Sequence, residues 1–216
     1  MENVQDFDTA ACPRFDDTEL DEVVIEAQLA ELPHLDSDRR YDEPFTVERL
    51  FKTEKAETAA ETLGRIPTAR QATHLIINGR FALWDFVPAV LKLSNRTIKQ
   101  LYLATLGFSR KNIQELSLLL DEKKIKSVSL LCSHYFKGTS NGIYEFAEEQ
   151  LAQRGQRFAS CRTHAKIVLA QLSNGRTVTI ESSANLRSCK NIEQVVVGGD
   201  PGLYRFHVAW MEELFK

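Results

Sequence analysis

Short apolar runs alternate with helical patterns between Thr73 and Arg154, and this alternation predicts an α/β fold. The predicted strands in this part of the chain are 74–78, 98–106 and 126–133, and the predicted helices are 81–93, 109–122 and 140–154. Because strands and helices follow one another in turn, we expect a mixed, largely parallel sheet flanked by helices.

The pattern changes after Gly155, where predicted strands follow one another directly. These strands cover 157–162, 163–172, 177–181 and 192–197. The tetrapeptide Ser-Asn-Gly-Arg at 173–176 is typical of a β-hairpin with a two-residue turn. Asp200 and Pro201 have the residue types of a helix N-cap and first helical position, so a terminal helix is predicted to begin there.

Charge divides the chain into two parts. Residues 1–65 are predicted to be an acidic, partly helical N-terminal extension, with helical patterns at 18–32 and 46–63, and residues 66–216 are predicted to be the folded domain. Residues 1–50 hold 4 basic and 15 acidic side chains, and residues 51–216 hold 23 basic and 15 acidic side chains. The formal net charge of −3 is therefore the sum of −11 and +8. A basic domain is compatible with a polyanionic partner.

Several classes of protein are excluded by composition. No apolar run approaches the roughly 18 to 20 residues of a membrane span, and the first residues lack a signal-peptide pattern, so we expect a cytoplasmic protein. The cysteines form no C-x-x-C pair, so neither a zinc site nor a disulfide framework is indicated; they are Cys12, Cys132, Cys161 and Cys189.

The predicted hairpin brings polar side chains together. A two-residue turn at 174–175 places Lys166 opposite Ser183 and His164 opposite Asn185. His164 and Lys166 also share a face of their strand, because side chains alternate along a strand. A neutral imidazole can attack phosphorus while an ammonium and an amide stabilise the negative charge, so this set suits a phosphodiester.

Glu193 is the nearest downstream carboxylate and can accept a hydrogen bond from the second ring nitrogen of His164. That hydrogen bond would fix the tautomer of the imidazole. No metal is required by such chemistry, and we expect no cofactor.

These residues resemble a known pattern. His164-Ala165-Lys166, the segment Ser182-Ser183-Ala184-Asn185 and the later Glu193 are similar to the His-x-Lys, Gly-Ser-x-Asn and Glu of the single-motif branch of the phospholipase D superfamily. The resemblance covers about residues 70–216. It implies a phospholipase D-like sandwich and a metal-independent phosphodiesterase, with His164 as nucleophile, Lys166 and Asn185 binding phosphate, Ser183 assisting and Glu193 orienting His164.

The same resemblance implies an assembly and a substrate class. Single-motif members of the family are chiefly nucleases and form two-fold dimers, in which one His164 attacks and the other protonates the leaving oxygen. We therefore expect a homodimer with nucleic acid as its substrate. Two alternatives stay open: a catalytically weak or inactive nucleic-acid-binding or interaction protein on the same fold, and a lipid phosphodiesterase.

Two positions depart from the family pattern. Gln171 stands where the family has Asp, and Ser182 stands where it has Gly. Gln171 is expected to lie on the face of the strand opposite His164, and Ser182 narrows the space around the phosphate. These departures motivate the alternative of a binding protein.

Four further residues are predicted to bind substrate. Arg162, Arg187 and Lys190 flank the site in sequence and are expected to contact backbone phosphates. His134 follows a strand that should end on the same rim, and it is expected to contact substrate.

The acidic arm provides a test of the charge division. Deleting residues 1–45 removes 3 basic and 14 acidic side chains, a net charge of −11. If the arm screens the basic domain, the deletion raises the affinity for DNA by about tenfold in low salt, measured by fluorescence anisotropy. Unchanged affinity would contradict screening and would leave the arm as a solubilising or partner-binding tail.

Overall fold

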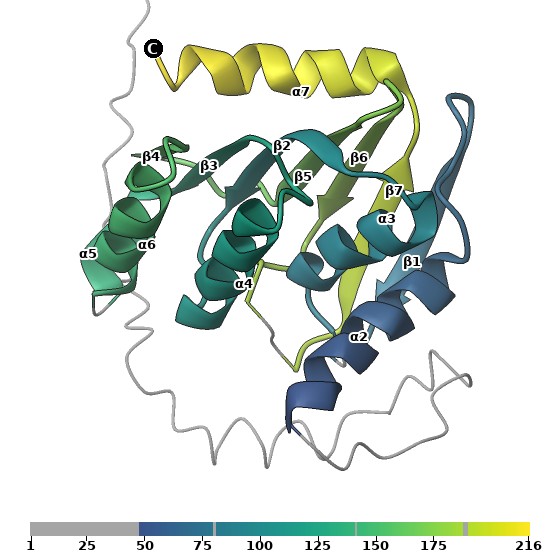
Figure 1. Cartoon of the computed structure of the whole chain (residues 1–216), viewed down its shortest axis with the longest axis horizontal. Coiled ribbons are helices and arrows are strands. Elements are labelled where there is room, and N and C mark those ends of the chain that lie inside the picture. Colours follow the sequence, from purple (N-terminus) through teal and green to yellow (C-terminus); the bar gives the residue numbers. More distant parts are fainter. Residues whose placement is uncertain (1–47, 80, 141, 188–189) are drawn as a thin grey trace, which may run out of the picture. The chain divides into compact units, whose positions relative to one another are not determined.

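The computed structural model describes residues 48–79, 81–140, 142–187 and 190–216 (Figure 1). The helix predicted at 18–32, Cys12 and Cys189 lie outside these residues. Within the described ranges, no helix is long and apolar enough to cross a membrane.

Seven strands form one mixed sheet in the described part of the chain, and each overlaps a predicted strand. The strands are β1 (Ala72–Ile77), β2 (Ile98–Thr105), β3 (Val128–Ser133), β4 (Arg157–Cys161), β5 (Ile167–Leu172), β6 (Thr177–Ser182) and β7 (Glu193–Gly198), in the sheet order β1-β7-β6-β5-β2-β3-β4.

Strand direction confirms the mixed sheet. The pairings of β2 with β3 and of β3 with β4 are parallel, and the other four are antiparallel. Five of the seven strands nevertheless run in one direction, because two antiparallel pairings separate β2 from β6 and two more separate β6 from β1. The parallel pairs lie where the sequence alternates between strand and helix.

Helices cover both faces of this sheet (Figure 1). They are α2 (Glu48–Leu63), the 3-10 turn η1 (Leu83–Asp85), α3 (Phe86–Ser94), α4 (Arg110–Asp121), α5 (His134–Thr139), α6 (Ile143–Ala152) and α7 (Pro201–Glu213). Along β2, Leu101 and Leu103 join the apolar core beneath α2, α3, α4 and α6, whereas Tyr102 and Ala104 join the core beneath α7. With both faces covered, the strand ends are left as the accessible polar positions.

Two predicted helices differ from the observed ones. The range 81–93 begins as a 3-10 turn, so Pro88 lies in the first turn of α3, where its missing N–H is tolerated. The range 140–154 contains the shorter α6, and the unpredicted α5 precedes it. The Ser133 side chain caps α5 by accepting a hydrogen bond from the Tyr135 N–H. The remaining helices of the described part are as predicted.

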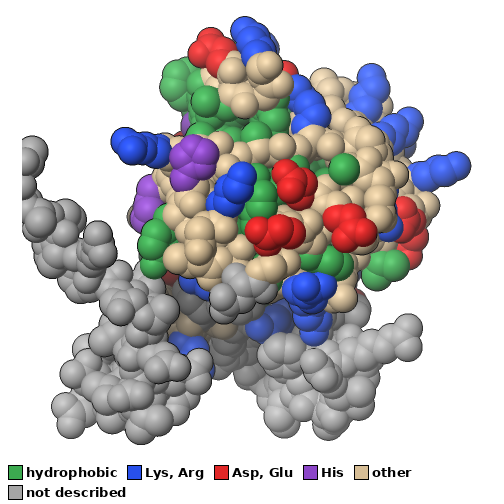
Figure 2. Space-filling model, turned by 90° about the vertical axis from the view of Figure 1, so that its left-hand side faces the viewer, with side chains coloured by type: hydrophobic (Ala, Val, Ile, Leu, Met, Phe, Trp, Pro, Cys, Tyr) green, Lys and Arg blue, Asp and Glu red, His purple; other side chains and the backbone are tan. Residues whose placement is uncertain are grey.

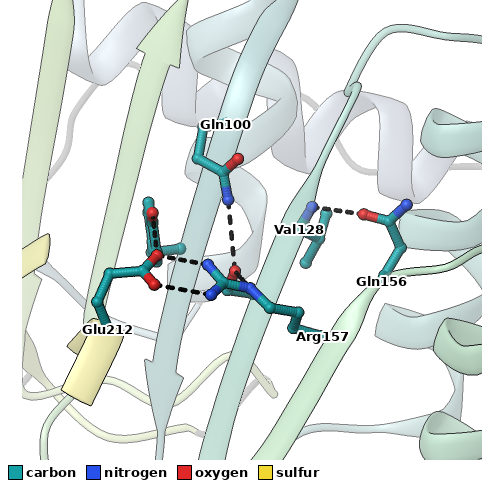
Figure 3. A network of polar contacts seen from close by, with 7 residues as sticks. Gln100, Val128, Gln156, Arg157 and Glu212 are labelled. Carbon is teal, nitrogen blue, oxygen red and sulfur yellow. Dashed lines mark hydrogen bonds and ion pairs between the residues drawn. The ribbon is translucent and has the colours of Figure 1, made fainter. Parts of the chain in front are cut away.

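A polar network fastens α7 to the sheet (Figure 3). Arg157 of β4 donates from both terminal nitrogens to the Glu212 carboxylate of α7, and one of these distances is 2.7 Å. The Tyr102 hydroxyl of β2 donates to the same carboxylate. Arg157 Nε also donates to Ser129 Oγ at 3.0 Å, and Gln100 donates to that oxygen from the other side. One carboxylate thus ties α7 to two strands.

These contacts perturb the titration of the groups involved. The hydrogen bonds from Arg157 and then from Tyr102 lower the pKa of Glu212 to about 2. Burial, and then the neighbouring Glu212, raise the pKa of Tyr102 to about 12. A second contact holds α7 against β6, since His207 Nε2 lies 3.1 Å from Glu181 Oε1.

Replacing Glu212 tests this network. The side chains of Arg157 and Glu212 are 40% and 36% exposed, so after solvent screening the pair contributes about 1 kcal/mol to the free energy of unfolding at neutral pH. Because the folded pKa of about 2 lies below the ordinary 4.5, this contribution is present above pH 4.5 and is lost as the pH falls toward 2. Glu212→Gln should therefore lower stability at pH 7 and flatten its acid dependence, as measured by chemical denaturation. Glu213→Gln is the matched control, and equal acid dependence in the two variants would contradict the assignment.

Candidate active site

The candidate site lies at the edge of the sheet where the parallel strands end. β5 begins there, with Ile167 paired to Ala104 near the end of β2. β7 also begins there, with Glu193 paired to Ile77 at the end of β1. Residues 162–166, 183–187 and 190–192 are therefore brought to one edge, which we call the carboxyl edge. Loops at this edge commonly hold binding residues in α/β sheets.

The predicted register of the β5–β6 hairpin is wrong by one residue. Strand partners have numbers that sum to 348, as in Gln171 with Thr177, rather than 349. The loop holds three residues, because the Leu172 N–H donates to the Arg176 carbonyl and Gly175 takes a left-handed φ of 85°. Lys166 consequently lies opposite Ser182, whose N–H donates to the Lys166 carbonyl at 3.0 Å. Ser183 is not the cross-strand partner of Lys166, and Asn185 is not that of His164.

His164 and Lys166 are nevertheless in contact. Lys166 Nζ lies 2.9 Å from His164 Nδ1 and donates to the His164 carbonyl at 3.0 Å. Lys166 is 8% exposed, whereas the His164 ring is open to solvent. Burial lowers the pKa of Lys166, and the negative charge of Glu193 opposes this shift. A partly desolvated cation therefore stands beside an accessible imidazole.

Ser183 and Glu193 form the second part of the site. The Ser183 hydroxyl donates to Glu193 Oε2 and accepts from the Gln194 N–H at 2.9 Å. The Ser183 hydroxyl is thus one partner of the Glu193 carboxylate, and the orientation of His164 by Glu193 remains a prediction. The Glu193 charge still acts on Lys166 and so reaches the first pair.

Ser182 has a structural role that its place in the motif did not indicate. Its hydroxyl donates to the Gln194 carbonyl of β7 at 2.7 Å and accepts from the Ala184 N–H at 2.9 Å. A glycine could not form this bridge. The substitution therefore strengthens the turn by which the chain leaves β6 toward the site.

Asn185 lies in the same turn and is half buried. Its Oδ1 is buried and has no hydrogen-bond partner among the described residues. The next residue, Leu186, is 1% exposed, and its N–H donates to the Thr105 hydroxyl at 3.3 Å. Thr105, at the end of β2, thus positions the Asn185 segment. Nothing in the sequence motif pointed to Thr105, because Thr105 and Leu186 are 81 positions apart.

The other predicted residues lie around the same edge. His134 opens α5 directly after β3, is exposed, and has Nδ1 3.0 Å from Ser160 Oγ. Arg162, Arg187 and Lys190 are exposed. Their predicted role as phosphate contacts remains a prediction.

Gln171, in contrast, is remote from the site. It lies five residues beyond Lys166 in β5, about 16 Å along the strand. Its place opposite Thr177 is near the turn of the hairpin. The departure from the family Asp therefore does not alter the side chains at the carboxyl edge.

The contact with a charged Lys166 restricts the tautomer of a neutral His164. An ammonium has only donors, so a charged Lys166 meets Nδ1 of His164 when that nitrogen carries no proton. The neutral ring then holds its proton on Nε2, which is the form of a proton donor. A nucleophilic Nε2 requires the proton on Nδ1 and an acceptor beside it.

In the described ranges no three His, Cys, Asp or Glu side chains form a group that could hold a metal ion.

Comparisons with known proteins identify similar folds. No protein-family model matches the chain, and no curated protein matches it by sequence. A polyphosphate kinase from Porphyromonas gingivalis is similar over 86% of this chain and 32% of its own, with 15% identity and a TM-score of 0.52. This chain thus spans about a third of that kinase, and at such identity the similarity concerns the fold alone.

Two further structures have lower scores. Nuc, a phospholipase D family member from Salmonella typhimurium, has a TM-score of 0.47 and 13% identity over 67% of this chain and 94% of its own. A phosphatidylserine synthase from Haemophilus influenzae Rd KW20 has a TM-score of 0.48 and 13% identity over 74% of this chain and 41% of its own. Scores below 0.5 add no argument to the fold assignment.

The electrostatic coupling between Lys166 and Glu193 can be measured. Glu193→Gln keeps an acceptor for Ser183 but removes the negative charge that favours the ammonium, so the pKa of Lys166 should fall further. The measurement is a pH titration of the Lys166 side chain by NMR. Glu181→Gln, on the face beneath α7, should leave that pKa unchanged. An unchanged or higher pKa in Glu193→Gln would contradict the described site.

Proposed function

We propose that this chain, which has the phospholipase D-like α/β fold, hydrolyses phosphodiester bonds with His164 as the nucleophile. The observation that carries the proposal is the contact of Lys166 Nζ with His164 Nδ1 at the carboxyl edge. A cation and an imidazole at this distance can bind one phosphate together, the first to its oxygens and the second to its phosphorus. Fold similarity alone does not assign an activity.

Substrate binding is proposed to convert the site to its nucleophilic form. The Lys166 ammonium turns from Nδ1 to a non-bridging oxygen of the phosphate, and the Asn185 amide donates to a second oxygen. His164 Nδ1 is then free to carry the proton and to donate to the Ser183–Glu193 pair. The lone pair on Nε2 becomes available for attack.

The proposed reaction proceeds in two displacements. His164 Nε2 forms a bond to phosphorus as the bond to the leaving oxygen breaks, and a general acid protonates that oxygen. Water then attacks the phosphohistidine and gives up a proton to the same group, the P–N bond breaks, and His164 is restored. We assign the general acid to His164 of the partner subunit in a two-fold homodimer, since each protomer supplies one imidazole beside Lys166.

Nucleic acid is the proposed substrate. Residues 51–216 carry a net charge of +8, and Arg162, Arg187 and Lys190 are exposed near the site, where they would contact adjacent phosphates. A polymer of regularly spaced phosphates matches this distribution of basic side chains better than a single lipid headgroup does.

A specific observation also supports a second function, in which the protein binds nucleic acid without cleaving it. In the described state Lys166 Nζ lies 2.9 Å from Nδ1 of His164. A charged Lys166 at that position requires the proton of a neutral ring to be on Nε2. If substrate does not displace Lys166, the ring stays a proton donor and the site binds phosphate without forming a covalent bond.

Cleavage in chelator distinguishes the two functions. The protein should cleave DNA or RNA in excess EDTA, and His164→Ala should lower the rate by about a thousandfold or more because it removes the nucleophile. His207→Ala is the matched control, since that imidazole lies beneath α7, and it should retain activity. Equal cleavage by wild type and His164→Ala would contradict the phosphodiesterase proposal. Binding without cleavage by both would establish the second function.

A further inference from the structure

Five basic side chains gather at the edge of the sheet opposite the candidate active site. Residues 95–99 enter β2 and residues 122–126 precede β3, and these segments lie side by side. The Ile98 N–H donates to the Lys124 carbonyl at 2.9 Å, and the Lys126 N–H donates to the Ile98 carbonyl at 2.9 Å. We call the resulting cluster the basic edge; it consists of Arg96, Lys99, Lys123, Lys124 and Lys126.

The positive charge of the basic edge is not neutralised within the described part of the chain. All five side chains are exposed, and no ion pair with a described residue involves any of them. Nearby Asp121 is taken by Arg154 at 2.8 Å. Glu122 is the one acidic residue within the two segments, so their net charge is 5 − 1 = +4.

The concentration of positive charge at the basic edge differs from the charge distribution on the neighbouring surface. Figure 2 looks onto the side where α5, α6 and β4 lie in Figure 1, and there basic and acidic side chains are interspersed. The basic edge instead brings cations from two adjoining segments together with a single acidic residue. Repulsion among them falls when they pair with the phosphates of a polyanion, which releases the counterions condensed on that polyanion.

The apolar residues of the two segments indicate the class of partner. Ile98 is 0% exposed and Ile125 is 1% exposed, so both face the core. Protein interfaces are built around an apolar or aromatic centre, which these segments do not offer. Contacts with a phosphate backbone need only exposed Lys and Arg side chains. The chemistry therefore favours nucleic acid over an acidic protein.

We propose that the basic edge binds the phosphate backbone of nucleic acid at a surface separate from the candidate active site. β2 joins the two edges and has eight residues, so they are about 25 Å apart. That length corresponds to about seven base pairs of duplex. The basic edge thus holds a polynucleotide well away from the His164–Lys166 pair, and its binding does not depend on His164 being a nucleophile.

The test measures DNA affinity in a full-length His164→Ala background, so that no cleavage intervenes. The triple variant Lys123→Gln, Lys124→Gln and Lys126→Gln should bind a duplex of about 30 base pairs at least tenfold more weakly at about 50 mM salt. Its plot of log affinity against log salt should be shallower by about 2.7, which is 0.9 for each phosphate that the variant no longer neutralises. Fluorescence anisotropy gives both quantities.

A charge-matched control excludes an effect of net charge alone. Arg65→Gln, Arg70→Gln and Arg205→Gln remove three exposed cations that lie in α7 or before β1, which is four positions from β2 in the sheet, and should change neither quantity. The proposal would be overturned if both triple variants lost affinity equally, or if the lysine variant lost none. It would also be overturned if polyglutamate of the same charge as the DNA competed for the protein as well as DNA does. With His164 present, both triple variants should process a short model phosphodiester at the same rate, so failure of this proposal is distinguishable from failure of the proposed function.

Discussion

The register of the β5–β6 hairpin is the constraint on which the rest of the candidate site depends. A shift of one residue along a strand exchanges the faces on which all its side chains lie. The three-residue loop, with Gly175 in a left-handed conformation, places Lys166 beside Ser182. Ser182 then bridges to Gln194 of β7, and Ser183 is left free to meet Glu193. The loop at one end of the hairpin thus determines the contacts at the other.

Packing on both faces of the sheet keeps that register in place. One core lies beneath α2, α3, α4 and α6, and the other lies beneath α7. Arg157, Tyr102 and Glu212 fasten α7 over β2 and β4. With the strands held on both sides, rearrangement is confined to the strand ends. The proposed movement of the Lys166 ammonium from the imidazole to the phosphate requires motion only at the strand ends.

The sequence predicted the elements of the fold better than their contacts. Apolar runs located every described strand, because a covered sheet requires them. The Asn-Gly pair located the hairpin turn, but a two-residue and a three-residue loop share that signature, and the register was therefore one residue off. The capped helix α5 is too short to show a helical period. Contacts between distant positions, such as Tyr102 with Glu212 and Thr105 with Leu186, leave no local pattern.

The motif predicted the central pair of the site for a physical reason. His164 and Lys166 are two residues apart in the segment that enters β5, so their contact is local and does not depend on the register of the hairpin. The cross-strand partners depended on the register and were assigned incorrectly. Ser182 was read as a departure from the family, whereas its hydroxyl links β6 to β7.

The proposed mechanism requires His164 to form a covalent bond to phosphorus. The direct measurement is to quench the protein with end-labelled oligonucleotide within one turnover and to identify any labelled peptide by mass spectrometry. An acid-labile adduct is expected on the peptide that contains His164, and no adduct is expected in His164→Asn. Cleavage without any adduct during the first turnover, or an adduct on another residue, would contradict it.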